Sequence, residues 1–275
     1  MRRLVLVLAD GLRPDAITPS VMPSLKALGG VFTLALHART VRPSATVAAL
    51  ASLATGVGPD AHRLIEPGLG FLPRLRNIRP VAQLLAAAGI PTDIVAGDLE
   101  AATVPVAWAL SATAGVRRLT AKGSRARDTA AAAARLIAQR EERLLFLYLP
   151  DCDRAGHAHG WMSPGYLEAA AEVDAAIGLL SPWTDDAVFI VTADHGGGGV
   201  YGNEHDLPDP INDHIPLVLA GPGVTRRHQL TRPVSLLDVP PTVLWWFGVP
   251  VPESYEGRFL REAFARTPTA APVPA

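Results

Sequence analysis

Short apolar runs, each bounded by polar residues, glycine or proline, recur along this chain. Such runs predict strands covered on both faces of a sheet, because aliphatic and β-branched side chains there face no water. The predicted strands are residues 4–9, 32–38, 92–96, 144–149, 188–191 and 215–220. The fifth run is followed by Asp194, His195 and four glycines. This combination predicts either a ligand-binding pair at the carboxyl end of a strand or a pair that caps a loop.

Between the predicted strands, apolar positions return at the spacing of one helix face. The predicted helices are residues 22–28, 47–54, 80–88, 128–139, 166–180 and 236–247. Gly29, Gly56 and Gly89 stand where helices commonly end, and we expect Asp128 to cap the helix it opens. Because strands alternate with helices, the pattern predicts an α/β fold, a three-layer αβα sandwich with a mostly parallel central sheet.

No internal repeat and no linker divides the chain, so we expect residues 1–262 to form a single domain. Residues 58–79 and 97–127 lack clear periodicity and are predicted to be loops or a small, minimal cap. The Pro/Ala-rich residues 263–275 are predicted to be a disordered tail.

The amino-acid composition excludes some functional classes of protein. The net charge of −1, with 49% hydrophobic and 19% charged residues, is ordinary for a globular protein and argues against specific nucleic-acid binding. A single cysteine excludes an internal disulfide and fits a reducing compartment. The apolar N-terminal run stops at Asp10, which is too short for a signal peptide, and no run reaches membrane-spanning length. We expect a soluble, cytoplasmic protein without a membrane partner.

Acidic and histidine side chains gather after the predicted strands. They are Asp10, Asp151, Asp153, His157, Asp194, His195, His205 and His214. Several carboxylates at one sheet edge repel one another unless a cation is present. A mixed Asp/His set suits zinc or manganese, and two such ions use about six protein ligands. Thr46 falls at the N-terminus of a predicted helix, where a hydroxyl beside the ions is a candidate nucleophile.

Four segments carry a resemblance to a known family. They are Asp10-Gly-Leu-Arg-Pro-Asp15, Pro43-Ser-Ala-Thr46 with Thr55-Gly56 and Pro59-Asp-Ala-His62, Asp153-Arg-Ala-Gly-His157, and Asp194-His195-Gly196. From residue 4 to about residue 260 the chain resembles the alkaline phosphatase superfamily, and within it the type I phosphodiesterase/nucleotide pyrophosphatase branch.

The resemblance implies two divalent metal ions, zinc or manganese. One is held by Asp10, Thr46, Asp194 and His195, and the other by Asp153, His157 and His205. His205 is preferred to His214 because it stands eleven residues before Pro216, the spacing found in such proteins. Thr46 would attack phosphorus and form a phosphothreonine intermediate, and water would then hydrolyse it. The implied partner is a small phosphate-ester substrate.

The chain also departs from this family pattern. Arg63 follows His62, and Pro67 stands near the expected position of an Asn that contacts the phosphoryl group. Arg13, Arg42 and Asn77 are alternative donors, and the sequence does not select among them.

Other activities stay open. A phosphomonoesterase or phosphonate hydrolase would use the same metals, and an inactive metal-bound binding protein is a more remote alternative. A sulfatase is disfavoured, because Thr46 occupies the nucleophile position and Cys152 lies outside a Cys-x-Pro-x-Arg pattern. Asp151 is expected to cap the turn after Pro150, and His159 to face solvent or support a ligand.

Overall fold

A central mixed sheet organises the protein. The computed structural model describes residues 2–65, 78–99 and 111–265. Within these residues the sheet has eight strands in the order β4-β3-β5-β1-β6-β7-β2-β8. The strands are β1 (Arg3–Ala9), β2 (Thr33–Arg39), β3 (Thr92–Ala96), β4 (Val116–Ala121), β5 (Arg143–Leu149), β6 (Val188–Thr192), β7 (His214–Ala220) and β8 (His228–Gln229). The six predicted strands are therefore present, with ends shifted by at most one residue.

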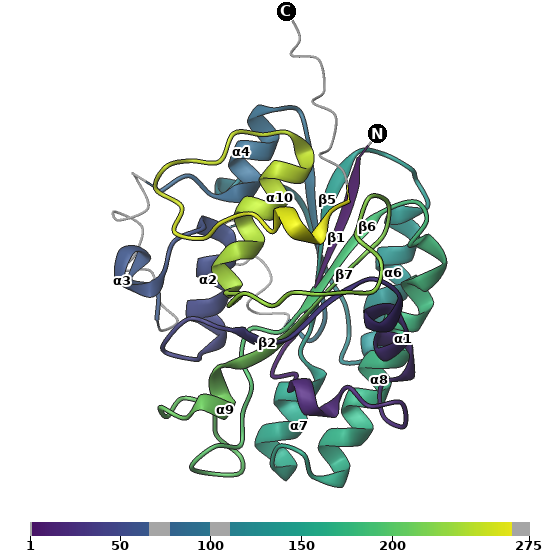
Figure 1. Ribbon diagram of the computed structural model, residues 1–275, viewed down its shortest axis with the longest axis vertical. Helices are drawn as coiled ribbons and strands as arrows, with labels where there is room; N and C mark the ends of the chain where they lie inside the picture. The colour runs from purple at the N-terminus through teal and green to yellow at the C-terminus, as the bar shows by residue number, and fades with distance from the viewer. Residues whose placement is uncertain (1, 66–77, 100–110, 266–275) are drawn as a thin grey trace, which may run out of the picture.

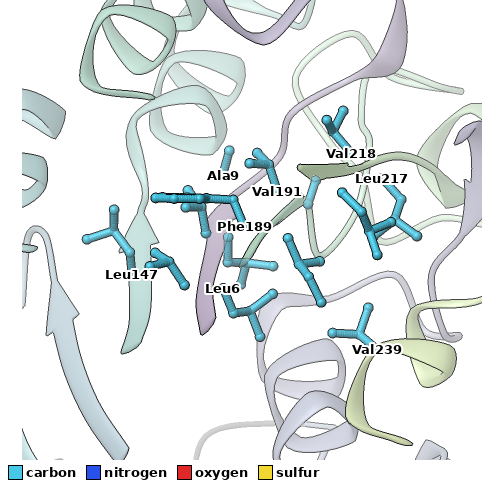
Figure 2. Packing of buried hydrophobic residues seen from close by; sticks show 14 of the residues in the cluster. Leu6, Ala9, Leu147, Phe189, Val191, Leu217, Val218 and Val239 are labelled. Carbon is cyan, nitrogen blue, oxygen red and sulfur yellow. The ribbon is translucent and has the colours of Figure 1, made fainter. Parts of the chain in front are cut away.

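Most neighbouring strands are parallel, and β7 is antiparallel to both of its neighbours, β6 and β2. The central parallel strands β5, β1 and β6 are buried on both faces, as their continuous apolar runs predict. Figure 2 shows part of this core, with Leu147 and Phe189 on one face of the sheet and Leu6 on the other face, where Val239 approaches from a covering helix.

Two helical layers cover the sheet (Figure 1). One layer contains α1 (Pro23–Val31), α6 (Ala126–Ile137), α7 (Asp151–His159) and α8 (Pro164–Leu180). The other contains α2 (Thr46–Thr55), α4 (Val81–Ala87) and α10 (Val239–Phe247). Shorter pieces are α3 (Pro59–His62), α9 (Pro210–Asp213), η1 (Pro14–Ala16), η3 (Ser181–Trp183), η4 (Leu236–Asp238) and η5 (Arg261–Ala263). The three-layer αβα sandwich expected from the sequence is confirmed.

Several local predictions are wrong. Helix α1 continues through Gly29 and Gly30 to Val31, and it is closed at Phe32, whose backbone N–H donates to the carbonyl oxygen of Leu28. Asp128 does not cap α6, which begins at Ala126, so that Asp128 lies in its first turn. The Asp151 carboxylate instead lies near this helix end, where the Ala126 backbone partly offsets the rise in its pKa that burial causes.

Other elements extend the predicted picture. Residues 151–159, a motif without an expected element, form helix α7, and β4 occupies part of the segment expected to be loop or cap. The closing helix is divided into η4 and α10. Phe264, two residues past the expected domain end, is buried, whereas residues 266–275 lie outside the described part of the chain. No helix among the described residues is both long and apolar enough to span a membrane.

Candidate metal centre

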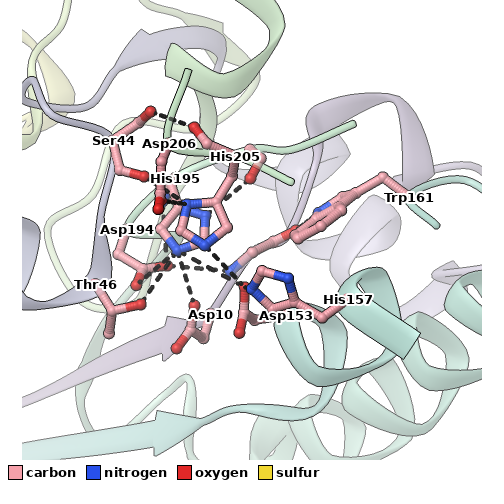
Figure 3. A network of polar contacts seen from close by, with 12 residues as sticks. Asp10, Ser44, Thr46, Asp153, His157, Trp161, Asp194, His195, His205 and Asp206 are labelled. Atoms are coloured by element: carbon pink, nitrogen blue, oxygen red, sulfur yellow. Dashed lines mark hydrogen bonds and ion pairs between the residues drawn. The ribbon is translucent and has the colours of Figure 1, made fainter. Parts of the chain in front are cut away.

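The carboxyl ends of three adjacent strands bring the predicted ligands together. Strands β5, β1 and β6 are neighbours and run parallel, so their ends meet at one edge of the sheet. Asp10 follows β1, Asp194 and His195 follow β6, and Asp153 lies in the first turn of α7 after β5. Neighbouring strands lie only about 4.8 Å apart, so these side chains converge on one point (Figure 3).

A first group contains Asp10, Asp194 and His195, all buried. The His195 Nε2 atom lies 3.3 Å from Asp10 Oδ1 and 3.5 Å from Asp194 Oδ2. The Thr46 hydroxyl oxygen lies 3.2 Å from the same Nε2 atom. The structure therefore places together the four residues that the family resemblance assigns to one metal.

A second group surrounds Asp153. Its Oδ1 atom lies 3.4 Å from His157 Nε2, 3.7 Å from His205 Nε2 and 3.9 Å from His195 Nε2. Asp153, His195 and His205 have ligand atoms within 4.8 Å of one another. The rings of His195 and His205 stack with centroids 3.8 Å apart, so the two groups form one continuous set. His157 stands at its edge with a partly exposed side chain.

The hydrogen bonding of the carboxylates tests whether this set fits a cation. Asp194 Oδ1 accepts the backbone N–H groups of Gly11 and His195, and Asp10 Oδ2 accepts the Tyr148 hydroxyl. The remaining oxygens, Asp10 Oδ1, Asp194 Oδ2 and Asp153 Oδ1, are buried without any hydrogen-bond donor. Buried carboxylate oxygens without a partner are costly. Three of them facing histidine nitrogens fit a divalent cation.

The three histidines are oriented by their other ring nitrogen. His157 Nδ1 lies 2.9 Å from the carbonyl oxygen of Asn203, His195 Nδ1 lies 2.8 Å from that of Gly196, and His205 Nδ1 lies 2.7 Å from that of Ser44. A carbonyl oxygen only accepts, so Nδ1 carries the hydrogen in each ring. This leaves each Nε2 as the nitrogen directed at the carboxylates, an arrangement typical of metal-binding histidines.

The electrostatics of the site point the same way. Burial and the nearby Asp10 raise the pKa of Asp194 to about 7. Burial by itself would lower the pKa of His195, but the Asp194 and Asp10 carboxylates outweigh it and raise that pKa to about 10. The site therefore favours positive charge beside its carboxylates, whether from a proton on His195 or from a cation.

Thr46 is the first residue of α2 and follows Ala45 in extended conformation, as the sequence predicts. The backbone N–H groups of a helix's first turn have no partner within the helix and favour an anion. Ser44 fixes this loop to the ligand loop, because its hydroxyl donates to the carbonyl oxygen of His205 at 2.6 Å. Its own carbonyl accepts from His205 Nδ1.

Other predicted residues lie apart from the ligands. His214 is the first residue of β7, and its ring lies 6.0 Å from that of His37. Arg13 pairs with Asp15 and donates to the carbonyl oxygen of Gly197, while Arg42 pairs with Asp213. His159 is exposed at the end of α7. Pro67 and Asn77 lie outside the described residues.

Gly11 and Tyr148 support the site and were missed in the sequence. Gly11 has φ +68° and lies against Asp153, whose Cα atom would be 2.8 Å from an added Cβ. Tyr148 could have been found in the sequence, because its hydroxyl is a polar group near the end of an otherwise apolar strand, β5. Burial and Asp10 raise the pKa of the Tyr148 phenol, which therefore stays a hydrogen donor.

Comparisons with known proteins identify the family of this chain. The model of the family described as type I phosphodiesterase/nucleotide pyrophosphatase matches residues 4–69 and 88–231. Arylsulfatase K of Canis lupus familiaris is 30% identical over 100 residues, which are 34% of this chain and 19% of that protein. Arylsulfatase K of Danio rerio is 31% identical over 120 residues, 40% of this chain and 23% of that protein. The matches thus span about a fifth of these relatives' length.

Solved structures show the same fold at low sequence identity. Human ectonucleotide pyrophosphatase/phosphodiesterase 5 matches with a TM-score of 0.75 and 13% identity, covering 96% of this chain and 100% of that chain. A phosphonate monoester hydrolase from Silicibacter pomeroyi matches with a TM-score of 0.74 and 18% identity, covering 100% of this chain and 78% of that chain.

Proposed function

The chain belongs to the type I phosphodiesterase/nucleotide pyrophosphatase family, within the alkaline phosphatase superfamily, and from this premise we propose that it is a metal-dependent phosphodiesterase. The observation that carries the proposal is the meeting of three unpaired buried carboxylate oxygens, three histidine Nε2 atoms and the Thr46 hydroxyl. Carboxylates alone would repel one another, and a helix N-terminus alone would only favour an anion. Together they fit a cation-assisted reaction on a phosphate ester.

Two divalent ions would be held by this set. Asp10, Asp194 and His195 would hold one beside Thr46, and Asp153, His157 and His205 would hold the other. Imidazole and carboxylate ligands in this mixture suit zinc, with manganese as the alternative. When bound, such ions lower the pKa of nearby hydroxyl groups and neutralise negative charge on phosphoryl oxygens.

Thr46 would be the nucleophile. Its Oγ1 forms a bond to phosphorus while the bond from phosphorus to the leaving oxygen breaks, and the Thr46 proton passes to solvent. Water then attacks phosphorus, the bond to Thr46 Oγ1 breaks, and the hydroxyl recovers a proton. The first-turn N–H groups of α2, which begins at Thr46, would bind a phosphoryl oxygen during both steps, because they have no partner within the helix.

Charge around Thr46 favours a diester over a monoester. A diester carries one negative charge and a monoester carries up to two, so a monoester gains more from additional cationic contacts. Arg13 and Arg42, the cationic candidates from the sequence, both pair with carboxylates and are not free for a phosphoryl group. A monoester would therefore find little extra charge among the described residues near the nucleophile.

Substrate rates test the choice of ester. We expect the zinc-reconstituted protein to hydrolyse a bis-aryl phosphate faster than an aryl phosphate monoester, an aryl phosphonate monoester or an aryl sulfate. The sulfate is included because relatives of this chain bear the name arylsulfatase K. A large preference for the monoester or the sulfate would contradict the proposed diesterase activity.

Substitution of the nucleophile tests the mechanism. Thr46→Ala should lower turnover by more than about 1,000-fold, because no other hydroxyl replaces the attacking atom. The variant should still bind metal with nearly unchanged affinity, since the carboxylates and histidines remain. Thr46→Ser keeps a hydroxyl and should retain measurable turnover. Loss of metal together with activity in Thr46→Ala would show that Thr46 is mainly a ligand.

A further inference from the structure

Trp161 contacts each of the four segments that carry a candidate aspartate or histidine ligand. It lies in the turn between α7 and α8, with 7% of its surface exposed. Its indole N–H donates to the carbonyl oxygen of Gly11, the residue after Asp10, at 2.9 Å. Its backbone N–H donates to the carbonyl oxygen of Gly202, in the loop that leads to His205, at 2.8 Å.

Glycines allow the indole to approach two more ligand segments. A Cβ added to Gly156, beside His157, would lie 2.5 Å from the indole, and one added to Gly198 would lie 2.7 Å from the Trp161 Cβ. At Gly197, two residues after His195, an added Cβ would overlap the indole. The backbone of these segments therefore rests directly on the ring.

The indole also touches two of the ligand rings. The His157 ring meets it edge-on with centroids 5.2 Å apart, and the His205 ring meets it edge-on at 5.7 Å. Figure 3 shows Trp161 beside both histidines. Trp161 also belongs to the buried hydrophobic cluster and has the Tyr166 ring at 6.3 Å, so two of the three aromatic rings around it in the described part of the chain are those of ligand histidines.

We propose that Trp161 is a positioning residue, which holds the four ligand-bearing segments in register and thereby sets the affinity of both metal sites. The proposal rests on the proposed function, since it requires that the site binds cations. Ligand sets lose affinity when their supporting residues allow shifts of about 0.5 Å, and loss of such supports weakens metal binding about 10- to 100-fold.

The surroundings of Gly11 allow Trp161 to be replaced by Phe without loss of folding. Its carbonyl oxygen also accepts the Tyr166 hydroxyl at 2.9 Å, so it keeps one hydrogen bond when the indole N–H is removed. Trp161→Phe therefore leaves no buried carbonyl unpaired and should fold. The smaller ring leaves space beside Gly156, Gly197 and the two histidines, which can then shift.

The test measures metal binding and stability separately. Wild type, Trp161→Phe and Trp161→Leu are stripped of metal, and zinc stoichiometry and affinity are measured by competition with a chromophoric chelator. The visible absorption of the cobalt-substituted proteins reports coordination geometry, and thermal unfolding of the metal-free proteins reports folding. Trp183→Phe is the matched control, because Trp183 lies in η3 before β6, at the sheet edge opposite the ligands.

We expect zinc affinity to fall about 10- to 100-fold in Trp161→Phe and further in Trp161→Leu, with an altered cobalt spectrum. Trp183→Phe should bind zinc like wild type, whatever its Tm. Wild-type zinc affinity and cobalt spectra in both Trp161 variants, with only a lower Tm, would overturn the proposal and leave the proposed function intact. Wild type that binds less than one zinc ion per chain would contradict the proposed function and this inference with it.

Discussion

Tyr148 holds one oxygen of Asp10 so that the other faces the metal centre. Its hydroxyl donates to Asp10 Oδ2, and Asp10 Oδ1 lies 3.3 Å from His195 Nε2. Tyr148→Phe removes this donor and frees the carboxylate to rotate. We expect zinc affinity to fall about 10- to 100-fold, as for other residues that orient a ligand. Isothermal titration of the metal-free protein measures the change.

Tyr255→Phe is the control for that substitution. The Tyr255 hydroxyl donates to the carbonyl oxygen of Arg79 at 2.9 Å, and no candidate ligand is its partner. Its loss should change stability without changing zinc affinity. Equal zinc affinity in Tyr148→Phe and wild type would show that the backbone alone orients Asp10.

At the scale of single residues, the sequence predicted groups whose chemistry is specific to a site. Asp10, Thr46 and Asp194 were identified because each follows a predicted strand or opens a predicted helix. Tyr148 and Trp161 were not, because an aromatic residue by default predicts packing in the core. Only the three-dimensional structure shows that their polar atoms meet Asp10 and Gly11.

His62 links two elements that follow the nucleophile, and it does so in its neutral form. The backbone N–H of Leu64 donates to His62 Nδ1 at 2.9 Å, so the hydrogen is on Nε2, which lies 3.0 Å from the Ser52 hydroxyl of α2. A proton on Nδ1 would lose the first of these bonds. Burial lowers the pKa of His62 below 6.5, and it outweighs the opposing effects of the Ala48 backbone and the Glu256 carboxylate.

Because the folded state lowers the pKa of His62, the protein should become less stable at acidic pH. The unfolded chain binds a proton at His62 near pH 6.5, whereas the folded protein binds it only at lower pH. The free energy of unfolding should decrease as the pH falls below about 6.5, down to the folded-state pKa. His62→Gln cannot titrate and keeps a donor for Ser52, so its stability should depend less on pH in this range.

Denaturant unfolding of both proteins at several pH values, each stripped of metal, measures the difference. Removing the metal excludes any effect of pH on metal binding, and the titration of the free ligands is common to both proteins and cancels in the comparison. Curves of equal slope for His62→Gln and wild type between pH 5 and 7 would contradict the assignment.

At the scale of elements, the sequence predicted helices and strands correctly where the local pattern of apolar and polar residues determines them. The strand runs and most helices were found, because period and end signals are local. The start of α1 was not fixed by a local cap. Asp174 of α8 accepts the N–H groups of Ser24 and Leu25 at 2.9 and 2.8 Å and satisfies that helix end from a distant part of the chain.

The direction in which a strand runs within the sheet also depends on residues distant in the sequence. The alternation of strands and helices predicts a mostly parallel sheet, and it does not distinguish β7, which pairs antiparallel with β6 and β2. The connection from β6 to β7 passes through the glycine loop, His205 and α9 instead of a crossover helix. This long return is what carries His205 back to Asp153.

At the scale of the whole molecule, the fold concentrates negative charge where a stable core would have none. Asp10, Asp194 and Asp153 converge from three strand ends, and each keeps a buried oxygen without a donor. The surrounding sheet is apolar and deeply buried, so the chain tolerates this unfavourable region. Such a conflict between local and global preference is expected at a functional site.

Asp194→Asn tests whether the buried carboxylate charge at this site serves to bind a metal ion. The Asn oxygen can still accept the N–H groups of Gly11 and His195, and the charge of the unpaired Oδ2 is removed. We expect the metal-free variant at pH 8 to have a Tm equal to or above that of metal-free wild type. Zinc should stabilise wild type by about 2.7 kcal/mol at 100 times its Kd, and the same concentration should stabilise the variant much less. Thermal unfolding with and without zinc measures both effects. A metal-free variant that is clearly less stable than metal-free wild type would mean that the Asp194 charge supports the fold itself, independent of any cation.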